Sequence, residues 1–515
     1  MDRRAISLSL ALVFAFGGPA TAAPPPSAAS ALSIPPGRIG RAVASLDGLV
    51  RAIMRKTGVP GVAVAVVHDD RVVFLKGYGL RNTRTKAPVD ADTIFELASV
   101  SKTVGAAVVA AEVGRGVVKW SDPVAKYVPG FTLADPWVGS HVTIGDMFAH
   151  RSGLPDHAGD LLEDLGFGRA DVLARLRFYP LDPFRIAYHY TNFGLTAGAL
   201  AAADAAGESW ERLSRERIYA PLGMTHTSSR FADYRDAKNH ADLHVRVGTA
   251  WEPRYERDAD AQSPAGGVSS SARDMANWLR FELAGGIFDG KRIVDSAALE
   301  ATRSPNLLSL PLATPESRGS FYGYGTGVGY DRAGRVRWSH SGAFSLGAAT
   351  TYVMLPSEHL GIVVLTNGFP IGVPETLASE FMDLAEFGKQ QDPWFDMYRS
   401  AFAKILEEHG QLVGQQRPTS PQCAPRAAEY VGTYASDLYG PAGVEAAGGG
   451  LVLILGPRHA RFPLAHWDGR TFSFQPSGEN AGGPSAVTFS GACGTAASQM
   501  TIEALGANGL GSFTR

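Results

Sequence analysis

Cysteine is scarce in this sequence. The only two cysteines, Cys423 and Cys493, both lie in the last hundred residues of a 515-residue chain. In an oxidising compartment they could form a disulfide, and otherwise they would be two buried thiols. Neither is a candidate nucleophile, because the sequence indicates no partner histidine for a catalytic thiol.

An excess of charge of one sign is also missing. The chain has 48 basic and 50 acidic residues, which leaves a formal net charge of −2. A nucleic-acid-binding protein would need a basic face, so no nucleic-acid partner is expected. The composition, 45% hydrophobic and 19% charged, is that of a globular protein, and the length predicts two domains.

The uncharged apolar run over residues 5–16 is too short to span a bilayer. Arg3 and Arg4 precede this run, and a small-x-small cleavage site ending at Ala22 follows it, so residues 1–22 are predicted to be a signal peptide. No cysteine follows the run that could carry a lipid. We therefore expect a periplasmic or secreted product with no stable membrane span after cleavage.

The motifs of several other enzyme classes are absent as well. There is no Gly-x-Ser-x-Gly, no His-Glu-x-x-His and no phosphate-binding loop. His150 and His157, near Asp156 and Asp160, follow no common metal-ligand spacing, so a structural loop is predicted there. The sequence therefore predicts neither a metal nor a cofactor.

Residues 39–410 are predicted to form one domain in which β-rich ends enclose a helical middle. Two β-branched runs over 61–79 are separated by Asp69 and Asp70, which predicts a hairpin, and helical segments alternate with loops over 120–300. The simplest assembly is an α+β fold, a mostly antiparallel sheet flanked by helices. Strand signals return over 324–331, 335–342, 347–356 and 360–368.

The rest of the chain divides into linkers and a second domain. Residues 23–38 are rich in proline and alanine, and 411–421 are polar with prolines, so both are predicted linkers. Residues 422–515 hold short strand-like runs separated by glycine and proline, which predicts a small all-β, barrel-like domain.

The first catalytic candidate is a serine followed three residues later by a lysine. Ser99 and Lys102 would share one face of a helix, where the lysine can reach the hydroxyl and activate it. No other lysine in the chain has a serine at that spacing. Near a helix N-terminus, the Ser99 N–H could also bind a developing oxyanion.

The second candidate element is Tyr190-Thr191-Asn192. A tyrosine phenol can pass a proton, and an asparagine amide can bind both a lysine and a substrate amide. Taken alone, such an aromatic next to an alanine-rich helix is more often part of the core.

The third candidate element is His340-Ser341-Gly342-Ala343, on a strand that is predicted to turn at Gly342. The glycine would let a ligand approach the backbone, and the N–H of Ala343 could be the second oxyanion donor. Taken alone, a histidine on a surface strand is the more common interpretation.

These three elements, in this order between β-rich ends, resemble the serine β-lactamase and penicillin-binding-protein superfamily. The Tyr-x-Asn element and the histidine of the third element are similar to the class C β-lactamase branch, and within it to its esterase, D-aminopeptidase and D-Ala-D-Ala carboxypeptidase relatives. The resemblance extends over about residues 40–370, and the segment beyond 420 resembles barrel domains appended to some members. The flanking phrases that agree are FAHRSGLPDH, APLGMTHTSS, SPAGGVSSSARDMANWL and LTNG.

The resemblance implies a role for each residue. Ser99 would attack the carbonyl and form an acyl-enzyme, while Lys102 and Tyr190 handle the proton. Asn192 would position the lysine and the substrate. The N–H groups of Ser99 and Ala343 would form the oxyanion hole. Which of Lys102 and Tyr190 is the base stays open at this point.

The substrate-binding segment His340-Ser341-Gly342 departs from the resemblance, because β-lactamases carry Lys-Thr-Gly there. A lysine supplies a fixed charge for the substrate carboxylate, whereas a histidine with a pKa of about 6.5 is mostly neutral at neutral pH. An exported serine hydrolase that cleaves an ester or D-amino-acid amide in a small molecule or short peptide is therefore expected. A true β-lactamase and a non-catalytic cell-wall-peptide or penicillin-binding relative are the alternatives, and the oligomeric state stays open.

Overall fold

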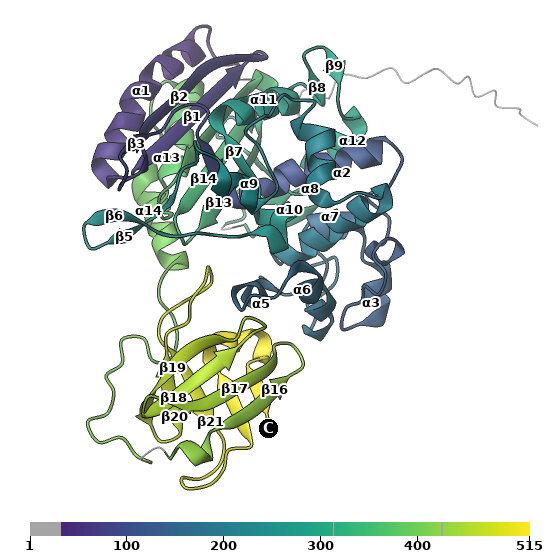
Figure 1. The fold of residues 1–515 in the computed structure, drawn as a ribbon. Coiled ribbons are helices and arrows are strands. Elements are labelled where there is room, and N and C mark those ends of the chain that lie inside the picture. The colour runs from purple at the N-terminus through teal and green to yellow at the C-terminus, as the bar shows by residue number, and fades with distance from the viewer. Residues whose placement is uncertain (1–31, 313, 424–425) are drawn as a thin grey trace, which may run out of the picture.

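The computed structural model describes residues 32–312, 314–423 and 426–515. Within them the chain forms a large domain of mixed helix and sheet and, near the C-terminus, a closed barrel (Figure 1). The predicted α+β class, with an antiparallel sheet and a small all-β domain, is confirmed. The predicted signal peptide and the first part of the predicted linker over 23–38 lie outside the described residues.

An antiparallel sheet of nine strands is the centre of the large domain. Across the sheet, these are β10 (Leu307–Leu310), β11 (Ser320–Tyr322), β12 (Gly327–Tyr330), β13 (Val336–Phe344), β14 (Ala348–Leu355), β15 (Leu360–Thr366), β1 (Gly61–His68), β2 (Arg71–Asn82) and β3 (Ala87–Pro88). The two ends of the domain meet in this sheet, because Val64 in β1 lies opposite Val364 in β15. The strands β14 and β15 are buried along their whole lengths, which fits their apolar sequences.

Three helices cover one face of the sheet. Helices α1 (Arg38–Thr57) and α13 (Val373–Phe387) pack against each other and against the sheet, and α14 (Trp394–Ile405) packs on α13 (Figure 1). Leu46 of α1 and Phe381 of α13 are completely buried in this layer. The segment after the last strand of the sheet therefore forms two helices.

The other face carries the helical middle of the domain, as predicted. Helices α2 and α7 are rich in alanine and glycine, so their backbones lie close to neighbouring elements; α2 is almost entirely buried and α7 is buried over most of its length. The helices are α2 (Ser101–Gly114), α3 (Pro136–His141), α4 (Ile144–Phe148), α5 (Asp160–Asp164), α6 (Arg169–Arg175), α7 (Asn192–Ala206), α8 (Trp210–Ser214), α9 (Phe231–Asp236), α10 (Ser263–Gly266), α11 (Ala272–Leu283) and α12 (Ser296–Glu300).

Three small two-stranded sheets complete the large domain. They pair β4 (Ile94–Glu96) with β7 (Ser269–Ser271), β5 (Leu243–Val247) with β6 (Ala250–Tyr255), and β8 (Ile287–Phe288) with β9 (Lys291–Arg292). No helix in the described part of the chain is both long enough and apolar enough to cross a membrane.

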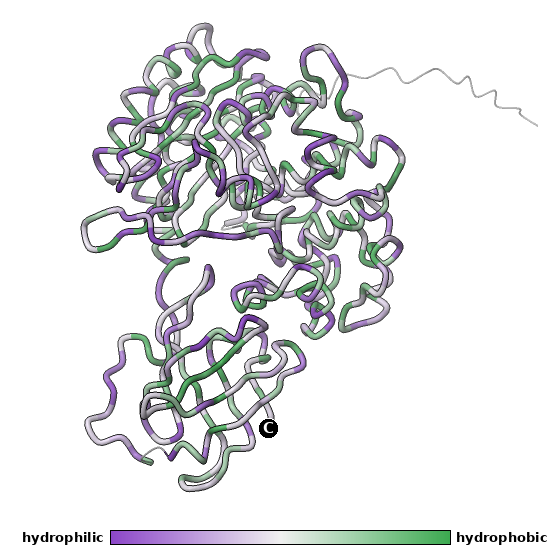
Figure 2. The backbone as a smooth tube through the Cα atoms, in the orientation of Figure 1, coloured by the Kyte–Doolittle hydropathy of each residue, from purple (hydrophilic) through white to green (hydrophobic). Residues whose placement is uncertain are grey.

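The C-terminal domain is a closed antiparallel barrel of eight strands. They are β16 (Gly432–Ser436), β17 (Gly440–Ala447), β18 (Gly450–Leu455), β19 (Ala460–Asp468), β20 (Thr471–Phe474), β21 (Ser485–Phe489), β22 (Gln499–Ile502) and β23 (Ser512–Thr514). Hydrophobic stretches follow its strands (Figure 2). Aromatic side chains fill the interior, where the ring centroids of Tyr430 and Phe489 are 4.9 Å apart.

A disulfide joins Cys423, ahead of the first barrel strand, to Cys493 between β21 and β22. The two cysteines are 70 residues apart in the chain, so the bond closes a loop that contains most of the barrel. Of the two alternatives that the sequence left open, the structure has the bonded one.

We expect the double variant Cys423→Ser, Cys493→Ser to lower the stability of the barrel by roughly 4 kcal/mol, because opening a loop of this length restores chain entropy to the unfolded state. Thermal unfolding of the full chain, followed by calorimetry, measures this loss. Reduction of the wild-type protein should reproduce it, and a variant that unfolds at the wild-type temperature would contradict the expectation.

Candidate active site

The candidate nucleophile lies where a short strand passes into a buried helix. A single 3-10 turn, Ala98–Val100, connects β4 to α2, and Ser99 lies in the middle of that turn. Ala98 has a φ of 47°, in the left-handed region that non-glycine residues seldom adopt, so the backbone is strained one residue before the nucleophile. Ser99 is partly exposed, whereas Lys102 is completely buried.

The amine of Lys102 is surrounded by three oxygen atoms. Its Nζ lies 3.0 Å from Ser99 Oγ, 2.6 Å from Asn192 Oδ1 and 3.0 Å from the carbonyl oxygen of Ala265 in α10. A neutral amine fits this environment, because it can donate two protons to the carbonyl oxygens and accept the Ser99 hydroxyl proton. Burial lowers the pKa of Lys102 to about 7, so the neutral form is well populated near neutral pH.

Asp160, at the start of α5, accepts a hydrogen bond from the side chain of Asn192. The Asn192 side-chain N–H donates to Asp160 Oδ2 at 2.8 Å, which directs the other end of the amide, Oδ1, at Lys102. The carboxylate also opposes the effect of burial, because its negative charge raises the pKa of Lys102. From the sequence, Asp160 had no role beyond a structural loop. Its position 32 residues before Asn192 leaves no local signal that connects them.

Tyr190 also lies at the amine. Lys102 Nζ is 4.4 Å from the centroid of the Tyr190 ring, and the Tyr190 phenol faces Ser99. Burial holds the pKa of Tyr190 well above its ordinary value, so the phenol stays protonated. Of the two candidate bases, the phenol is thus held in its protonated form, whereas the amine is partly neutral near neutral pH and is the stronger candidate for the base.

His340 is neutral, and its tautomer follows from its partners. Its Nδ1 lies 2.7 Å from the Ser341 carbonyl oxygen, which can only accept, so Nδ1 carries the proton. Nε2 is then the acceptor for the Tyr322 hydroxyl, 2.7 Å away. Burial and the charge of Lys102 lower the pKa of His340 to about 3. Tyr322 was not predicted from the sequence, because nothing in its segment indicates a partner on β13.

The other residues of the third element are divided between the two faces of the sheet. The strand β13 does not turn at Gly342 as predicted but continues to Phe344. A Cβ atom on Gly342 would lie 2.8 Å from the Ser99 nitrogen and 2.2 Å from the Leu97 oxygen, so only glycine lets β13 approach the nucleophile this closely. The backbone next to Ala343 therefore lies beside the Ser99 N–H.

The side chain of Ser341 points away from Ser99. Its Oγ lies 3.0 Å from Thr351 Oγ1 of β14 and next to Glu375 of α13, on the face opposite to the nucleophile. Alternate residues of a strand face opposite sides, so His340 and Ser341 cannot both point toward Ser99. The side chain of Ser341 is therefore not part of the substrate site.

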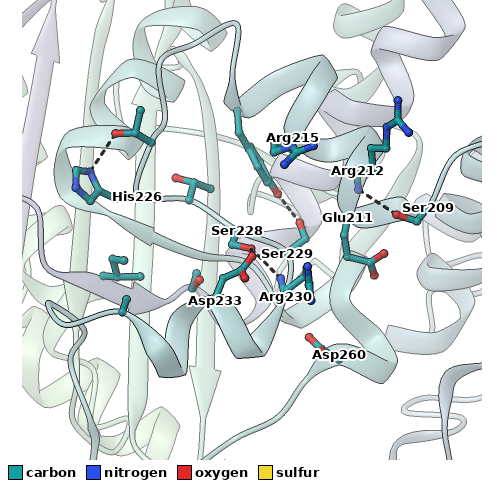
Figure 3. Close-up of a pocket in the computed structure, with 16 residues that line it drawn as sticks. Ser209, Glu211, Arg212, Arg215, His226, Ser228, Ser229, Arg230, Asp233 and Asp260 are labelled. Atoms are coloured by element: carbon teal, nitrogen blue, oxygen red, sulfur yellow. Dashed lines mark hydrogen bonds between the residues drawn. The ribbon is translucent and has the colours of Figure 1, made fainter.

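A cavity of about 710 Å³ lies elsewhere in the large domain, and Figure 3 shows its arginines and serines. None of the predicted site residues lines it, and its lining includes no lysine. The Ser228 hydroxyl donates to Asp233, and Ser229 is paired with Tyr219 at 2.7 Å. No group of three or more histidine, cysteine or acidic residues that could hold a metal ion occurs in the described ranges.

Known proteins resemble this chain in sequence and in fold. A family model described as Beta-lactamase matches residues 46–387, and one described as a domain of unknown function (DUF3471) matches residues 416–506. The octameric penicillin-binding protein homologue from Pyrococcus abyssi superimposes with a TM-score of 0.58 at 19% identity, over 90% of this chain and 98% of that one. This likeness shows a shared fold.

Curated relatives match over parts of the chain. Penicillin-binding protein 4 of Amycolatopsis lactamdurans is 31% identical over 62% of this chain and 83% of its own length. The unguisins hydrolase ungD of Aspergillus violaceofuscus is 31% identical over 43% of this chain, and the match spans only 41% of that relative. The beta-lactamase of Escherichia coli is 29% identical over 45% of this chain and 59% of its own length. Because the Beta-lactamase model covers well over half of the sequence, the chain belongs to the beta-lactamase family of serine hydrolases and penicillin-binding proteins.

Proposed function

We propose that this protein hydrolyses an ester or a D-amino-acid amide, in a small molecule or short peptide, through an acyl-enzyme on Ser99. The observation that carries the proposal is the buried amine of Lys102, held 3.0 Å from the Ser99 hydroxyl by two carbonyl oxygens. A serine next to a neutral buried amine is an activated nucleophile.

The geometry supports one order of proton transfers. Lys102 takes the Ser99 proton as Oγ bonds to the substrate carbonyl carbon, and the N–H groups of Ser99 and Ala343 stabilise the oxyanion. The Tyr190 phenol then protonates the leaving group and recovers a proton from the Lys102 ammonium. A water molecule, deprotonated by the same amine, then attacks the acyl carbon. As the bond from that carbon to Ser99 Oγ breaks, the Lys102 ammonium returns the proton to Oγ, which restores the free enzyme.

The preference for esters and D-amino-acid amides over β-lactams is based on His340. Both of its ring nitrogens are engaged, Nδ1 by the Ser341 carbonyl oxygen and Nε2 by Tyr322, and the ring is neutral. This position therefore supplies no fixed positive charge for a substrate carboxylate. A relative named as an unguisins hydrolase, beside one named as a penicillin-binding protein, is consistent with hydrolysis of substrates other than β-lactams.

Export is part of the same proposal. The charged start, short apolar run and small-x-small site of residues 1–22 support secretion or delivery to the periplasm. The disulfide between Cys423 and Cys493 supports the same compartment, because such bonds persist in oxidising environments.

We expect Ser99→Ala to abolish covalent labelling by a fluorophosphonate and to lower ester turnover by roughly 10³-fold or more, because the nucleophile is lost. Intact mass and steady-state kinetics measure both effects. Ser140→Ala, on the exposed surface of α3, is the matched control and should keep both. An adduct of undiminished yield on Ser99→Ala would refute the assignment, and a wild-type protein that forms no adduct would favour a non-catalytic relative.

We expect kcat/KM for an ester to rise with pH through about 7, because only the deprotonated amine of Lys102 can accept the Ser99 proton. Asp160→Asn removes a negative charge that raises the pKa of Lys102, so the midpoint of this rise should move to lower pH. Asp171→Asn, on the exposed face of α6, serves as the control and should leave the midpoint in place. A midpoint that moves upward in Asp160→Asn would contradict the role of Lys102.

We expect wild-type protein to turn over p-nitrophenyl esters and D-Ala p-nitroanilide faster than nitrocefin. His340→Lys should raise kcat/KM for nitrocefin about tenfold, because a charge-assisted hydrogen bond to a carboxylate contributes roughly 1.5–3 kcal/mol. His359→Lys, in the exposed turn before β15, adds the same charge away from Ser99 and should have no such effect. Nitrocefin as the best wild-type substrate would refute the proposed preference.

A further inference from the structure

The barrel reaches the large domain through one of its loops. The segment between β20 and β21, residues 475–484, carries Glu479 and Asn480 against two elements of the large domain. Arg175 of α6 donates to the carbonyl oxygens of Asp437 and Leu438, between β16 and β17, so the two domains are also connected at a second place. In Figure 1 the barrel lies below the large domain and faces α5 and α6.

The first element that the loop contacts is the turn between β13 and β14. The N–H of Ser345 donates to Glu479 Oε1 at 2.5 Å, and the Ser345 hydroxyl donates to the Glu479 carbonyl oxygen at 2.6 Å. The N–H of Leu346 lies 3.4 Å from Glu479 Oε2. Both carboxylate oxygens of a barrel residue thus bind backbone N–H groups two and three residues after Ala343, the proposed oxyanion donor.

The second element is α5. Its last residue, Asp164, accepts the N–H of Glu479 at 3.0 Å and the N–H of Asn480 at 2.9 Å. Its first residue, Asp160, binds Asn192, which in turn binds Lys102. One short helix therefore holds the barrel loop at one end and the catalytic amide at the other.

The loop is shaped for this contact. Gly478 has a φ of 116°, and a Cβ atom there would lie 2.5 Å from Asp164 Cγ. Only glycine combines this backbone conformation with so close an approach to the carboxylate. The turn on the other side is equally confined, because Phe344 and Leu346 pack in one apolar cluster with Ala98, the residue before Ser99.

The contact lies beside a buried cation, because Arg257 is almost completely buried whereas Glu479 and Asp164 are partly exposed. The Arg257 guanidinium binds Glu163 and attracts both Asp164 and Glu479, while its centre lies 5.2 Å from the centroid of Phe344. Glu96, in the strand that precedes Ser99, also interacts with the charge of Arg257. Burial raises the pKa of Glu479 to about 7, which its bonds to the Ser345 and Leu346 N–H groups and the charge of Arg257 only partly offset.

We propose that the barrel completes the active site, with Glu479 as a positioning residue that bridges the β13–β14 turn to α5. The inference rests on the proposed function, since it concerns the same oxyanion hole and the same amine. Glu479 acts through the backbone near Ala343 and through the helix that carries Asp160. Groups of the large domain donate hydrogen bonds to both carboxylate oxygens and to the carbonyl oxygen of Glu479. Its role is therefore to fix the position of the β13–β14 turn relative to α5.

The test compares Glu479→Ala and Glu479→Gln with wild-type protein in the full chain. We expect Glu479→Ala to lower ester kcat roughly tenfold or more with KM within about twofold of wild type, because removal of an oxyanion donor itself costs about 10²–10³-fold in kcat. The rate constant for fluorophosphonate labelling should fall in parallel. Glu479→Gln keeps one oxygen for the Ser345 N–H and should recover part of the rate.

One further variant and a control make the outcome decisive. Gly478→Ala should reproduce the loss while it leaves the Glu479 side chain intact, and it also serves if Glu479→Ala fails to fold. Glu445→Gln breaks an exposed ion pair with Arg461 in the same barrel and should leave kcat unchanged. A folded Glu479→Ala with wild-type kcat, or one in which only KM rises, would overturn the proposal. Wild-type protein without labelling would instead refute the proposed function.

Discussion

The burial of one amine organises the catalytic part of this molecule. Lys102 lies with its side chain removed from water, and three oxygens from separate segments converge on its Nζ: Ser99 Oγ, Asn192 Oδ1 and the Ala265 carbonyl oxygen. A buried ammonium is costly to desolvate, and the cost falls when the group is neutral. The same desolvation that destabilises the ammonium makes the amine a base near neutral pH, so the packing of α2, α7 and α10 around it determines its chemistry.

The sheet provides the frame beside this amine. Strand β13 approaches the backbone of Ser99 so closely that only Gly342 fits, and Ala98 holds a left-handed conformation on the other side of the contact. The left-handed conformation of Ala98 costs free energy that the surrounding packing must offset. Beside β13 in the sheet, the fully buried β14 pairs with it along seven residues and is itself paired to the fully buried β15.

Those parts of the site that depend on local spacing could be predicted from the sequence. Ser99 and Lys102 are about one helical turn apart, and the Tyr190-Thr191-Asn192 element leads into a helix. Each element can therefore be recognised from a few consecutive residues. Asp160 and Tyr322 could not be predicted, because their partners lie 32 and 18 residues away and only the folded chain brings them together. The sequence grouped Ser341 with His340 as substrate-binding, because the alternation along a strand does not indicate which set of residues faces the site.

The contact between the barrel and the large domain also joins residues that are far apart in the sequence. Glu479 and Ser345 are 134 residues apart, and the sequence around Glu479 is a glycine-rich loop with no motif of its own. Its importance follows from what it joins. A carboxylate that binds two backbone N–H groups orders the turn it contacts, and the turn shares an apolar cluster with Ala98. A domain whose own interior is filled by aromatic side chains can thus contribute to catalysis without binding a ligand, by restricting the backbone that stabilises the oxyanion.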